Sequence, residues 1–221
     1  MDANKSHSGT KSKSQSRGVW VLVLLVLFAS FAGQICAAET KTVVFFGDSL
    51  TAGLGLDPDD AYPAVIQKKI TAAGLPWRVV NAGLSGETTA GGLRRLDWIL
   101  RQPIDIFVIE LGANDGLRGL APELTRANLE MMISRVRAHN PHVKIVLAGM
   151  KVPTNLGPDY TKAFASVYPA VAQKCGVGLI PFLLDGVGGR PELNQGDGMH
   201  PTVEGHVKVA ETLWKVLLPL L

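Results

Sequence analysis

The chain has 221 residues, of which 47% are hydrophobic, and this length suits one globular domain better than two. Its formal net charge of +3 comes from residues 1–38, because the rest of the chain has 18 basic and 18 acidic residues. A nucleic-acid-binding domain carries its basic residues on a folded face, so this distribution argues against nucleic acid as a partner.

Residues 1–38 are arranged like an export signal. Basic residues precede an apolar run from Val19 to Ala32, and the small residues Cys36, Ala37 and Ala38 follow it. A helix of those 14 apolar residues would span about 21 Å, which is short of the roughly 30 Å hydrocarbon core of a bilayer. We therefore predict a signal peptide that is cleaved after Ala38, and a periplasmic or secreted protein.

Two alternatives stay open for this segment. If the apolar run is extended through Ile35, the segment is long enough to remain as an uncleaved membrane anchor. A lipid-modified Cys36 is less favoured, because the bulky Ile35 stands where such signals need a small residue. Cleavage after Ala38 would leave Cys175 as the only cysteine, so we expect no internal disulfide and a buried, unreactive thiol.

Beyond residue 38, short runs rich in β-branched and aromatic residues alternate with longer segments of helical periodicity. The predicted strands are Thr42–Phe46, Arg78–Asn81, Ile104–Leu111, Val143–Met150 and Gly178–Pro181. The predicted helices are Tyr62–Ala73, Thr88–Arg101, Pro122–Asn140, Tyr160–Cys175 and Thr202–Leu218. Continuous apolar runs such as FVIEL suit parallel strands that helices cover on both faces. We predict one α/β domain over residues 39–221, a three-layer α/β/α sandwich.

The first strand leads directly into a candidate nucleophile. Phe46 is followed by GDSLTAG, which places Ser49 on a tight turn at the carboxyl edge of the sheet, where open α/β sheets bind ligands. A helix beginning there would point its amide groups at an oxyanion formed beside Ser49. The alternative is that Asp48 and Ser49 only cap that helix, and this short motif alone does not separate the two.

The next two strands end in loops that offer hydrogen-bond donors. NAGLSGET follows the second strand and contains Gly86, whose backbone N–H can approach a substrate oxygen. ELGANDG ends the third strand and contains Asn114, whose side-chain amide can reach the same oxygen. Acyl transfer builds negative charge on that oxygen, and each preset donor lowers the barrier by roughly 3 kcal/mol. Either loop alone would also be typical of an ordinary turn.

The segment DGMHPTVEGH, before the last helix, supplies a candidate base. A serine is a poor nucleophile until a base removes its proton, and a histidine oriented by a carboxylate is the usual base. His200 and Asp197 lie three residues apart on one loop and provide both groups. His206 falls inside the predicted helix and should face elsewhere, and His139 and His142 flank a helix end, where a solvated or capping role is expected.

The four motifs together resemble the SGNH, or GDSL, hydrolase family. GDSL around Ser49, SGET with Gly86, GAND with Asn114, and DGMHP with Asp197 and His200 occur in the family's order. The likeness runs from about Val43 to the C-terminus. The segments ELGANDGLRG and YTKAFASVYPAVAQKCGVGLIPF resemble the branch of bacterial periplasmic multifunctional thioesterases, lysophospholipases and arylesterases.

The resemblance implies a flavodoxin-like five-stranded parallel sheet with strand order 2-1-3-4-5, and neither metal nor cofactor. It implies that Ser49 is the nucleophile, His200 the base and Asp197 the residue that orients it. It also implies an oxyanion hole made by Ser49, Gly86 and Asn114. The substrates of the branch are acyl-CoA thioesters, lysophospholipids and aryl or short-chain esters, which makes a small acyl ester or thioester the expected partner of a monomeric enzyme.

Other conspicuous residues are expected to have structural roles. Arg94, Arg95 and Asp97 are predicted to form a solvated helix face. Glu110 and Asp115 flank the GAND turn and should shape it, while Glu87 is a candidate hydrogen-bond partner of the loop near the site. The loop Lys151–Asp159 follows the fourth strand, and we expect it to form one wall of an acyl pocket.

Three functions compete at this point. The first is an esterase or thioesterase that acts on small acyl substrates, and the second is a carbohydrate deacetylase that uses the same residues. The third is a binding module without catalysis. The third is disfavoured because a binding module has no need to keep all five site residues, and the second because no carbohydrate-binding segment is visible.

Overall fold

The core of the fold is a parallel sheet of five strands. The computed structural model describes residues 1–3 and 39–221, so the predicted export signal lies outside the described residues. The sheet order is β2-β1-β3-β4-β5, and every neighbouring pair is parallel. The strands are β1 (Lys41–Gly47), β2 (Trp77–Gly83), β3 (Ile106–Glu110), β4 (Lys144–Ala148) and β5 (Gly178–Ile180). The predicted sheet and its implied strand order are confirmed.

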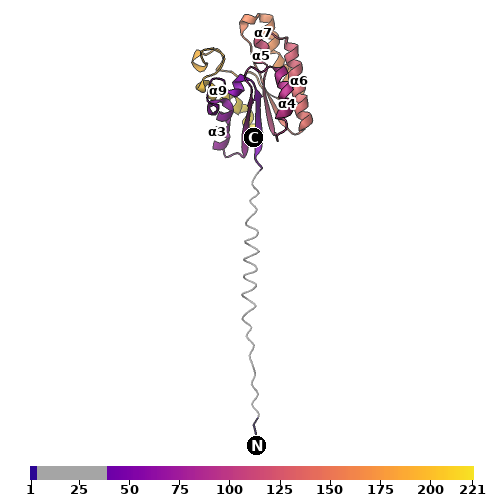
Figure 1. Ribbon diagram of the computed structural model, residues 1–221, viewed down its shortest axis with the longest axis vertical. Coiled ribbons are helices and arrows are strands. Elements are labelled where there is room, and N and C mark those ends of the chain that lie inside the picture. Colours follow the sequence, from indigo (N-terminus) through magenta and orange to yellow (C-terminus); the bar gives the residue numbers. More distant parts are fainter. Residues whose placement is uncertain (4–38) are drawn as a thin grey trace. The chain divides into compact units, whose positions relative to one another are not determined.

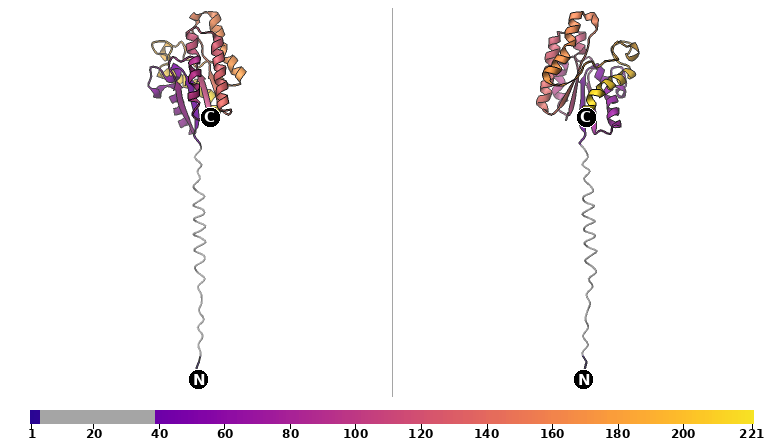
Figure 2. Two further views of the ribbon diagram at one scale, coloured as in Figure 1. Left: turned by 45° about the vertical axis from the view of Figure 1, so that its right-hand side comes forward. Right: turned by 180° about the vertical axis from the view of Figure 1, so that it is seen from behind.

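Helices cover both faces of this sheet (Figure 1). One face is covered by α3 (Tyr62–Ala72) and α9 (Val203–Leu217), which contact each other. The other face is covered by α4 (Thr89–Ile99), α6 (Pro122–His139) and α8 (Val167–Cys175), packed side by side in that order. The view from behind in Figure 2 shows the same separation of the two helical layers. The molecule is therefore the predicted three-layer α/β/α sandwich.

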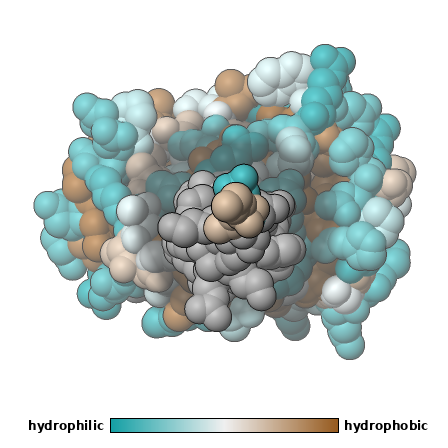
Figure 3. All heavy atoms as spheres, turned by 90° about the horizontal axis from the view of Figure 1, so that it is seen from below, coloured by the Kyte–Doolittle hydropathy of each residue, from teal (hydrophilic) through white to brown (hydrophobic). Residues whose placement is uncertain are grey.

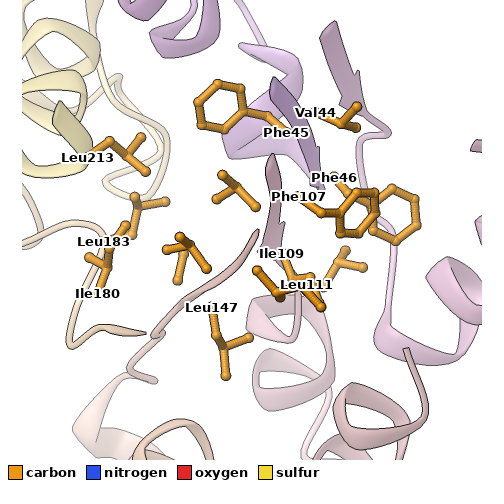
Figure 4. Close-up of a cluster of buried hydrophobic side chains, with 14 of the residues drawn as sticks. Val44, Phe45, Phe46, Phe107, Ile109, Leu111, Leu147, Ile180, Leu183 and Leu213 are labelled. Carbon is orange, nitrogen blue, oxygen red and sulfur yellow. The ribbon is translucent and has the colours of Figure 1, made fainter. Parts of the chain in front are cut away.

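The central strands β1, β3 and β4 are largely apolar because both of their faces are buried. Every residue of β3 is buried, and so is every residue of β1 after Lys41. Successive side chains point to opposite faces of a strand, and Figure 4 shows Phe45 on the opposite side of the sheet from Phe46 and Phe107. Phe45 meets Tyr62 of α3 with ring centroids 5.3 Å apart, and Phe46 meets Phe107 at 5.4 Å.

Predicted and observed elements have similar boundaries, with one larger exception. The predicted helix Tyr160–Cys175 is in fact two helices, α7 (Pro158–Ala165) and α8, separated at Ser166. Pro169 explains the break, because it has no N–H to donate and its ring would collide with the carbonyl of Ala165 in a continuous helix. The helix considered at the Ser49 turn is present as α2 (Ser49–Ala52), whereas the short helix α5 (Ala113–Leu117) was not predicted.

Four short 3-10 segments complete the described elements, at Pro58–Asp60, Thr154–Leu156, Pro191–Leu193 and Leu218–Leu220. Within residues 1–3 and 39–221, no helix has both the length and the apolar character needed to cross a bilayer.

Figure 3 views the end of the molecule opposite to α5 and α7, where hydrophilic residues predominate and apolar ones lie among them. The opposite edge, where the strands end, holds the loops that carry the predicted site.

Candidate active site

The turn after β1 holds Ser49 at the start of α2. Asp48 caps this helix, since its Oδ1 accepts the N–H of Leu50 at 3.1 Å. Gly47 is required here by close packing, because a Cβ at this position would lie 2.0 Å from Oγ1 of Thr51 and 2.4 Å from Oε2 of Glu110. Ser49 itself is buried, with 8% of its surface exposed, and its hydroxyl points to another loop.

Ser49, His200 and Asp197 form a continuous hydrogen-bonded line. Nε2 of His200 lies 2.8 Å from Oγ of Ser49, and Nδ1 lies 2.5 Å from Oδ2 of Asp197. Oδ1 of Asp197 accepts the backbone N–H groups of Met199 and His200 at 2.9 and 3.0 Å. These backbone hydrogen bonds, and the one to the imidazole, lower the pKa of Asp197 to about 2. The carboxylate is therefore ionised at neutral pH and fixed against the ring.

Asn114 and Gly86 approach the same place from two other loops. Asn114 lies in α5, directly after β3, and its Nδ2 donates to Oδ2 of Asp48 at 3.1 Å and to the carbonyl of Glu87 at 3.0 Å. Gly86 lies in the loop between β2 and α4 with a φ of +79°, which favours glycine over any other residue. Both residues line one cavity together with Ser49 and His200.

A buried carboxyl supports the nucleophile turn from beneath. Glu110 is fully buried at the end of β3, and its Oε2 accepts the hydroxyl of Thr51 at 2.6 Å and the N–H of Asp48 at 3.2 Å. Oγ1 of Thr51 also lies 2.6 Å from the hydroxyl of Tyr62. Burial raises the pKa of Glu110 well above its usual range and that of Asp48 to about 6. Glu110 therefore shapes the turn, as predicted, and has no exposed surface for substrate.

The cavity beside Ser49 has a volume of about 410 Å³ and is mainly apolar. Its apolar wall residues include Leu54, Leu117, Met150, Val152, Phe182, Leu184 and Met199. Lys151, Val152 and Pro153 line it from the loop after β4, which was predicted as one wall, whereas residues 154–159 of that loop are not among its lining residues. Such a space suits a small apolar group whose reacting end lies at Ser49 and His200.

The region that contains all four motifs matches a known protein family. Residues 45–208 match the GDSL-like lipase/acylhydrolase family. The chain belongs to this family. The matched region includes the three loops and the His200 segment that the structure brings to one edge of the sheet.

Three relatives of this GDSL-family chain are named as ester or thioester hydrolases. Esterase TesA of Pseudomonas aeruginosa is 44% identical, over 92% of this chain and 96% of its own length. An arylesterase of Vibrio mimicus is 38% identical, over 86% and 94%. Thioesterase 1/protease 1/lysophospholipase L1 of Escherichia coli K12 is 36% identical, over 83% and 86%.

A solved structure extends this agreement to three dimensions. The crystal structure of TesA matches with a TM-score of 0.78 and 44% identity, covering 82% of this chain and 100% of that one. The α/β fold and the family predicted from the motifs are thereby confirmed. This GDSL-family chain is an enzyme that hydrolyses acyl esters.

The other histidines of this hydrolase lie away from the line. His206 is buried in α9, and its Nδ1 accepts the N–H of Tyr62 at 3.0 Å. His139 ends α6 and His142 follows it, both exposed. Within residues 1–3 and 39–221, no group of three or more His, Cys, Asp or Glu side chains has an arrangement that holds a metal ion.

Cys175 was predicted to be buried, but its side chain is only half-buried. Desolvation raises the pKa of its thiol.

The prediction for Arg95 of this family member was wrong. Arg95 was assigned with Arg94 and Asp97 to a solvated face, but its guanidinium is largely enclosed and pairs with Glu87. Its Nη2 also donates to the carbonyl of Gly47 at 3.1 Å and to that of Ala82 at 2.9 Å. No pattern in the sequence singled out Arg95, since the glycine pair 91–92 indicates only that neighbouring side chains approach α4 closely.

Proposed function

We propose that the chain hydrolyses acyl esters and thioesters through an acyl-enzyme formed on Ser49. The observation that carries this proposal is the hydrogen-bonded line from Ser49 through His200 to Asp197. It contains a hydroxyl, a base within reach of its proton, and a carboxylate that orients the base. The two groups that would meet substrate, Ser49 and His200, both line the cavity.

In the first half-reaction, Oγ of Ser49 attacks the carbonyl carbon of the ester while its proton moves to Nε2 of His200. The imidazolium is stabilised by Asp197, whose lowered pKa keeps it ionised. The tetrahedral intermediate collapses, the bond to the leaving group breaks, and the leaving oxygen or sulfur takes the proton from His200. An acyl-enzyme and a free alcohol or thiol result.

In the second half-reaction, water takes the place of the alcohol. His200 accepts a proton from the water, the hydroxide attacks the acyl carbonyl, and the second tetrahedral intermediate releases the acid. The proton returns from His200 to Oγ of Ser49, which restores the enzyme. Both half-reactions need a neutral imidazole at their start.

The negative charge of both intermediates falls on the carbonyl oxygen. We assign its stabilisation to the backbone N–H groups of Ser49 and Gly86 and to Nδ2 of Asn114. These residues follow three neighbouring strands, β1, β2 and β3, and line one cavity, which supports the assignment. Preset donors of this kind are worth roughly 3 kcal/mol of barrier each.

The walls of the cavity support acyl substrates with small or medium apolar chains. Leucine, methionine, valine and phenylalanine side chains make up its apolar walls, and Lys151 also lines the cavity. The relatives named arylesterase and thioesterase 1/protease 1/lysophospholipase L1 favour aryl esters, acyl thioesters and lysophospholipids as the classes to test. We further propose that the protein is exported and monomeric. The order of basic, apolar and small residues in 1–38 supports export.

The test combines one substitution with a substrate panel. Ser49→Ala should abolish both hydrolysis of p-nitrophenyl esters and covalent labelling by a fluorophosphonate, because the bond forms to Oγ of Ser49. Ser134→Ala, at an exposed serine of α6, is the matched control and should keep both. The panel comprises p-nitrophenyl esters of rising chain length, palmitoyl-CoA and acetylated xylan. Labelling that persists in Ser49→Ala, or activity on xylan alone, would contradict the proposal.

A further inference from the structure

Arg95 of α4 joins the strand ends that carry the proposed oxyanion donors. Its guanidinium lies over the ring of Phe46, with Cζ 4.1 Å from the centroid, and its Nη2 donates to the carbonyl of Gly47. Both contacts are to the end of β1, immediately before Asp48. The same Nη2 donates to the carbonyl of Ala82 in β2.

The remaining contact of Arg95 reaches the loop that contains Gly86. Nε pairs with the carboxylate of Glu87, whose side chain is only 5% exposed. The backbone carbonyl of Glu87 accepts Nδ2 of Asn114 at 3.0 Å. Glu87 therefore links Arg95 on one side to Asn114 on the other, and the residue before it is Gly86.

The first turn of α4 leaves room for this link. A Cβ on Gly91 would lie 3.0 Å from Oε1 of Glu87, so a larger residue there would press on the carboxylate. The loop is closed at its other end as well, because the N–H of Leu84 donates to the carbonyl of Gly47, which also accepts from Arg95. Both ends of the segment Leu84–Glu87 are thus held against the end of β1.

We infer that Arg95 is a positioning residue that, through Glu87, sets the relative places of Ser49, Gly86 and Asn114 for the oxyanion. This inference rests on the proposed function. Arg95 is not among the residues that line the cavity, and it acts through the backbone of the loops that do. A guanidinium suits this task because its planar fork donates in several fixed directions at once, whereas the single ammonium of a lysine does not.

The primary test is Arg95→Lys, with Arg94→Lys as the matched control on the exposed side of the same helix. Arg95→Lys keeps the charge beside Glu87 and loses the fork. Small misplacements of catalytic groups cost up to about a hundredfold in rate. We therefore expect kcat to fall about ten- to a hundredfold with KM within about threefold of the wild type, while Arg94→Lys keeps both.

A second readout separates positioning from general loosening of the fold. A short alkylboronic acid forms a tetrahedral anion with the serine hydroxyl and places one oxygen where the oxyanion lies, whereas the carboxylate product mimics no tetrahedral state. In Arg95→Lys the inhibition constant of the boronic acid should rise in parallel with the loss in kcat, and that of butyrate should not. A kcat within about threefold of the wild type, a change in KM alone, or an unchanged boronic acid constant would overturn the inference.

If Arg95→Lys fails to fold, substitutions of its ion-pair partner Glu87 test the inference instead. Glu87→Ala releases the loop from Arg95, and Glu87→Gln keeps an oxygen that can accept from it. We expect Glu87→Ala to lose at least about tenfold in kcat and Glu87→Gln to recover most of that loss. Equal effects of the two, or none, would overturn the inference. Ser49→Ala serves as the reference throughout: if it is inactive while the variants of Arg95 and Glu87 are normal, only this inference fails, and if it is active, the proposed function fails.

Discussion

At the scale of single residues, the side-chain amide of Asn114 already donates to two groups of the protein. Both hydrogens of its Nδ2 are engaged, one by Asp48 and the other by the carbonyl of Glu87. An oxyanion can receive one of them only if the contact to Glu87 or to Asp48 is given up during the reaction. The contacts that orient the amide are thus also those that the reaction must partly replace.

We predict that Asn114→Ala lowers kcat by roughly a hundredfold to a thousandfold and changes KM little, because it removes one preset donor and leaves Ser49, His200 and Asp197 in place. Slow labelling by a fluorophosphonate should survive. Steady-state kinetics with a p-nitrophenyl ester provide the measurement. A near-normal kcat, or a rise in KM alone, would show that Asn114 is a turn residue or a contact of the ground state.

His206 makes stability depend on pH. Burial lowers its pKa from 6.5 to about 4, since the neutral ring accepts the N–H of Tyr62 and a charge there would be desolvated. Because the folded-state pKa lies below the unfolded one, this group contributes stability above about pH 6.5 that is lost as the pH falls towards 4. The loss amounts to about 3 kcal/mol at most.

The raised pKa values of Asp48 and Glu110 act in the opposite direction, because those carboxyls bind protons more tightly in the folded state. The effect of His206 is therefore measured as a difference between the wild type and His206→Asn, whose side-chain oxygen can still accept from Tyr62. Urea unfolding from about pH 7.5 to about 4.5 should show the advantage of the wild type shrinking on acidification. A constant difference over this range would refute the assignment.

The residues of the proposed site differ in how far the sequence revealed them. Ser49, Asp197 and His200 stand in short motifs whose chemistry is local, and the geometry supports the roles inferred for them. Arg95 stands in no such motif, and its helical position suggested solvent. It is enclosed because Glu87, which precedes α4, folds back over the first turn of the helix beside the ends of β1 and β2.

At the scale of elements, a polar cluster joins α4 to α5. Thr89 is the first residue of α4. Its N–H and its hydroxyl donate to the carboxylate of Asp115, which is buried in α5, at 2.8 and 2.5 Å. Nδ2 of Asn128 in α6 donates to the same hydroxyl at 2.9 Å. These contacts hold the helix starts that flank Gly86 and Asn114, as the predicted shaping role of Asp115 requires.

We predict that Asp115→Asn lowers the free energy of unfolding by about 1–3 kcal/mol, because an amide nitrogen would then face a buried donor. Urea denaturation gives this quantity. Asp97→Asn, at an exposed carboxylate of α4, is the control and should change it by less than about 0.5 kcal/mol. Equal effects of the two substitutions would mean that the cluster adds nothing to stability.

At the scale of the whole molecule, the open question is whether residues 1–38 are cleaved from the exported protein. We predict that the exported protein begins at Glu39, since cleavage after Ala38 removes the basic and apolar residues together. Intact-mass analysis and N-terminal sequencing of protein from the cell envelope would establish its first residue. A chain that still begins before Val19 and stays in the membrane fraction would instead support the uncleaved anchor.

The sequence by itself determined the α/β class, the five strands, the family and the hydrolase chemistry of this protein. Apolar runs and helical periodicity are local properties, and so are GDSL, GAND and DGMHP, in which the reactive residue and its backbone turn are adjacent. Even the break between α7 and α8 has a local cause in Pro169, although the continuous periodicity of the segment concealed it.

Only the tertiary structure decided which polar residues support the site. The N–H of Tyr62 donates to His206, which is 144 residues away in the sequence. The hydroxyl of Thr51 donates to Glu110, 59 residues away, and the side-chain amide of Asn114 donates to Asp48, 66 residues away. Such pairs depend on the order of the strands and on which side chains the helices enclose, and no periodicity records either. A charged residue such as Arg95 looks the same in the sequence whether solvent or a buried carboxylate surrounds it, because burial is a property of the packed layers.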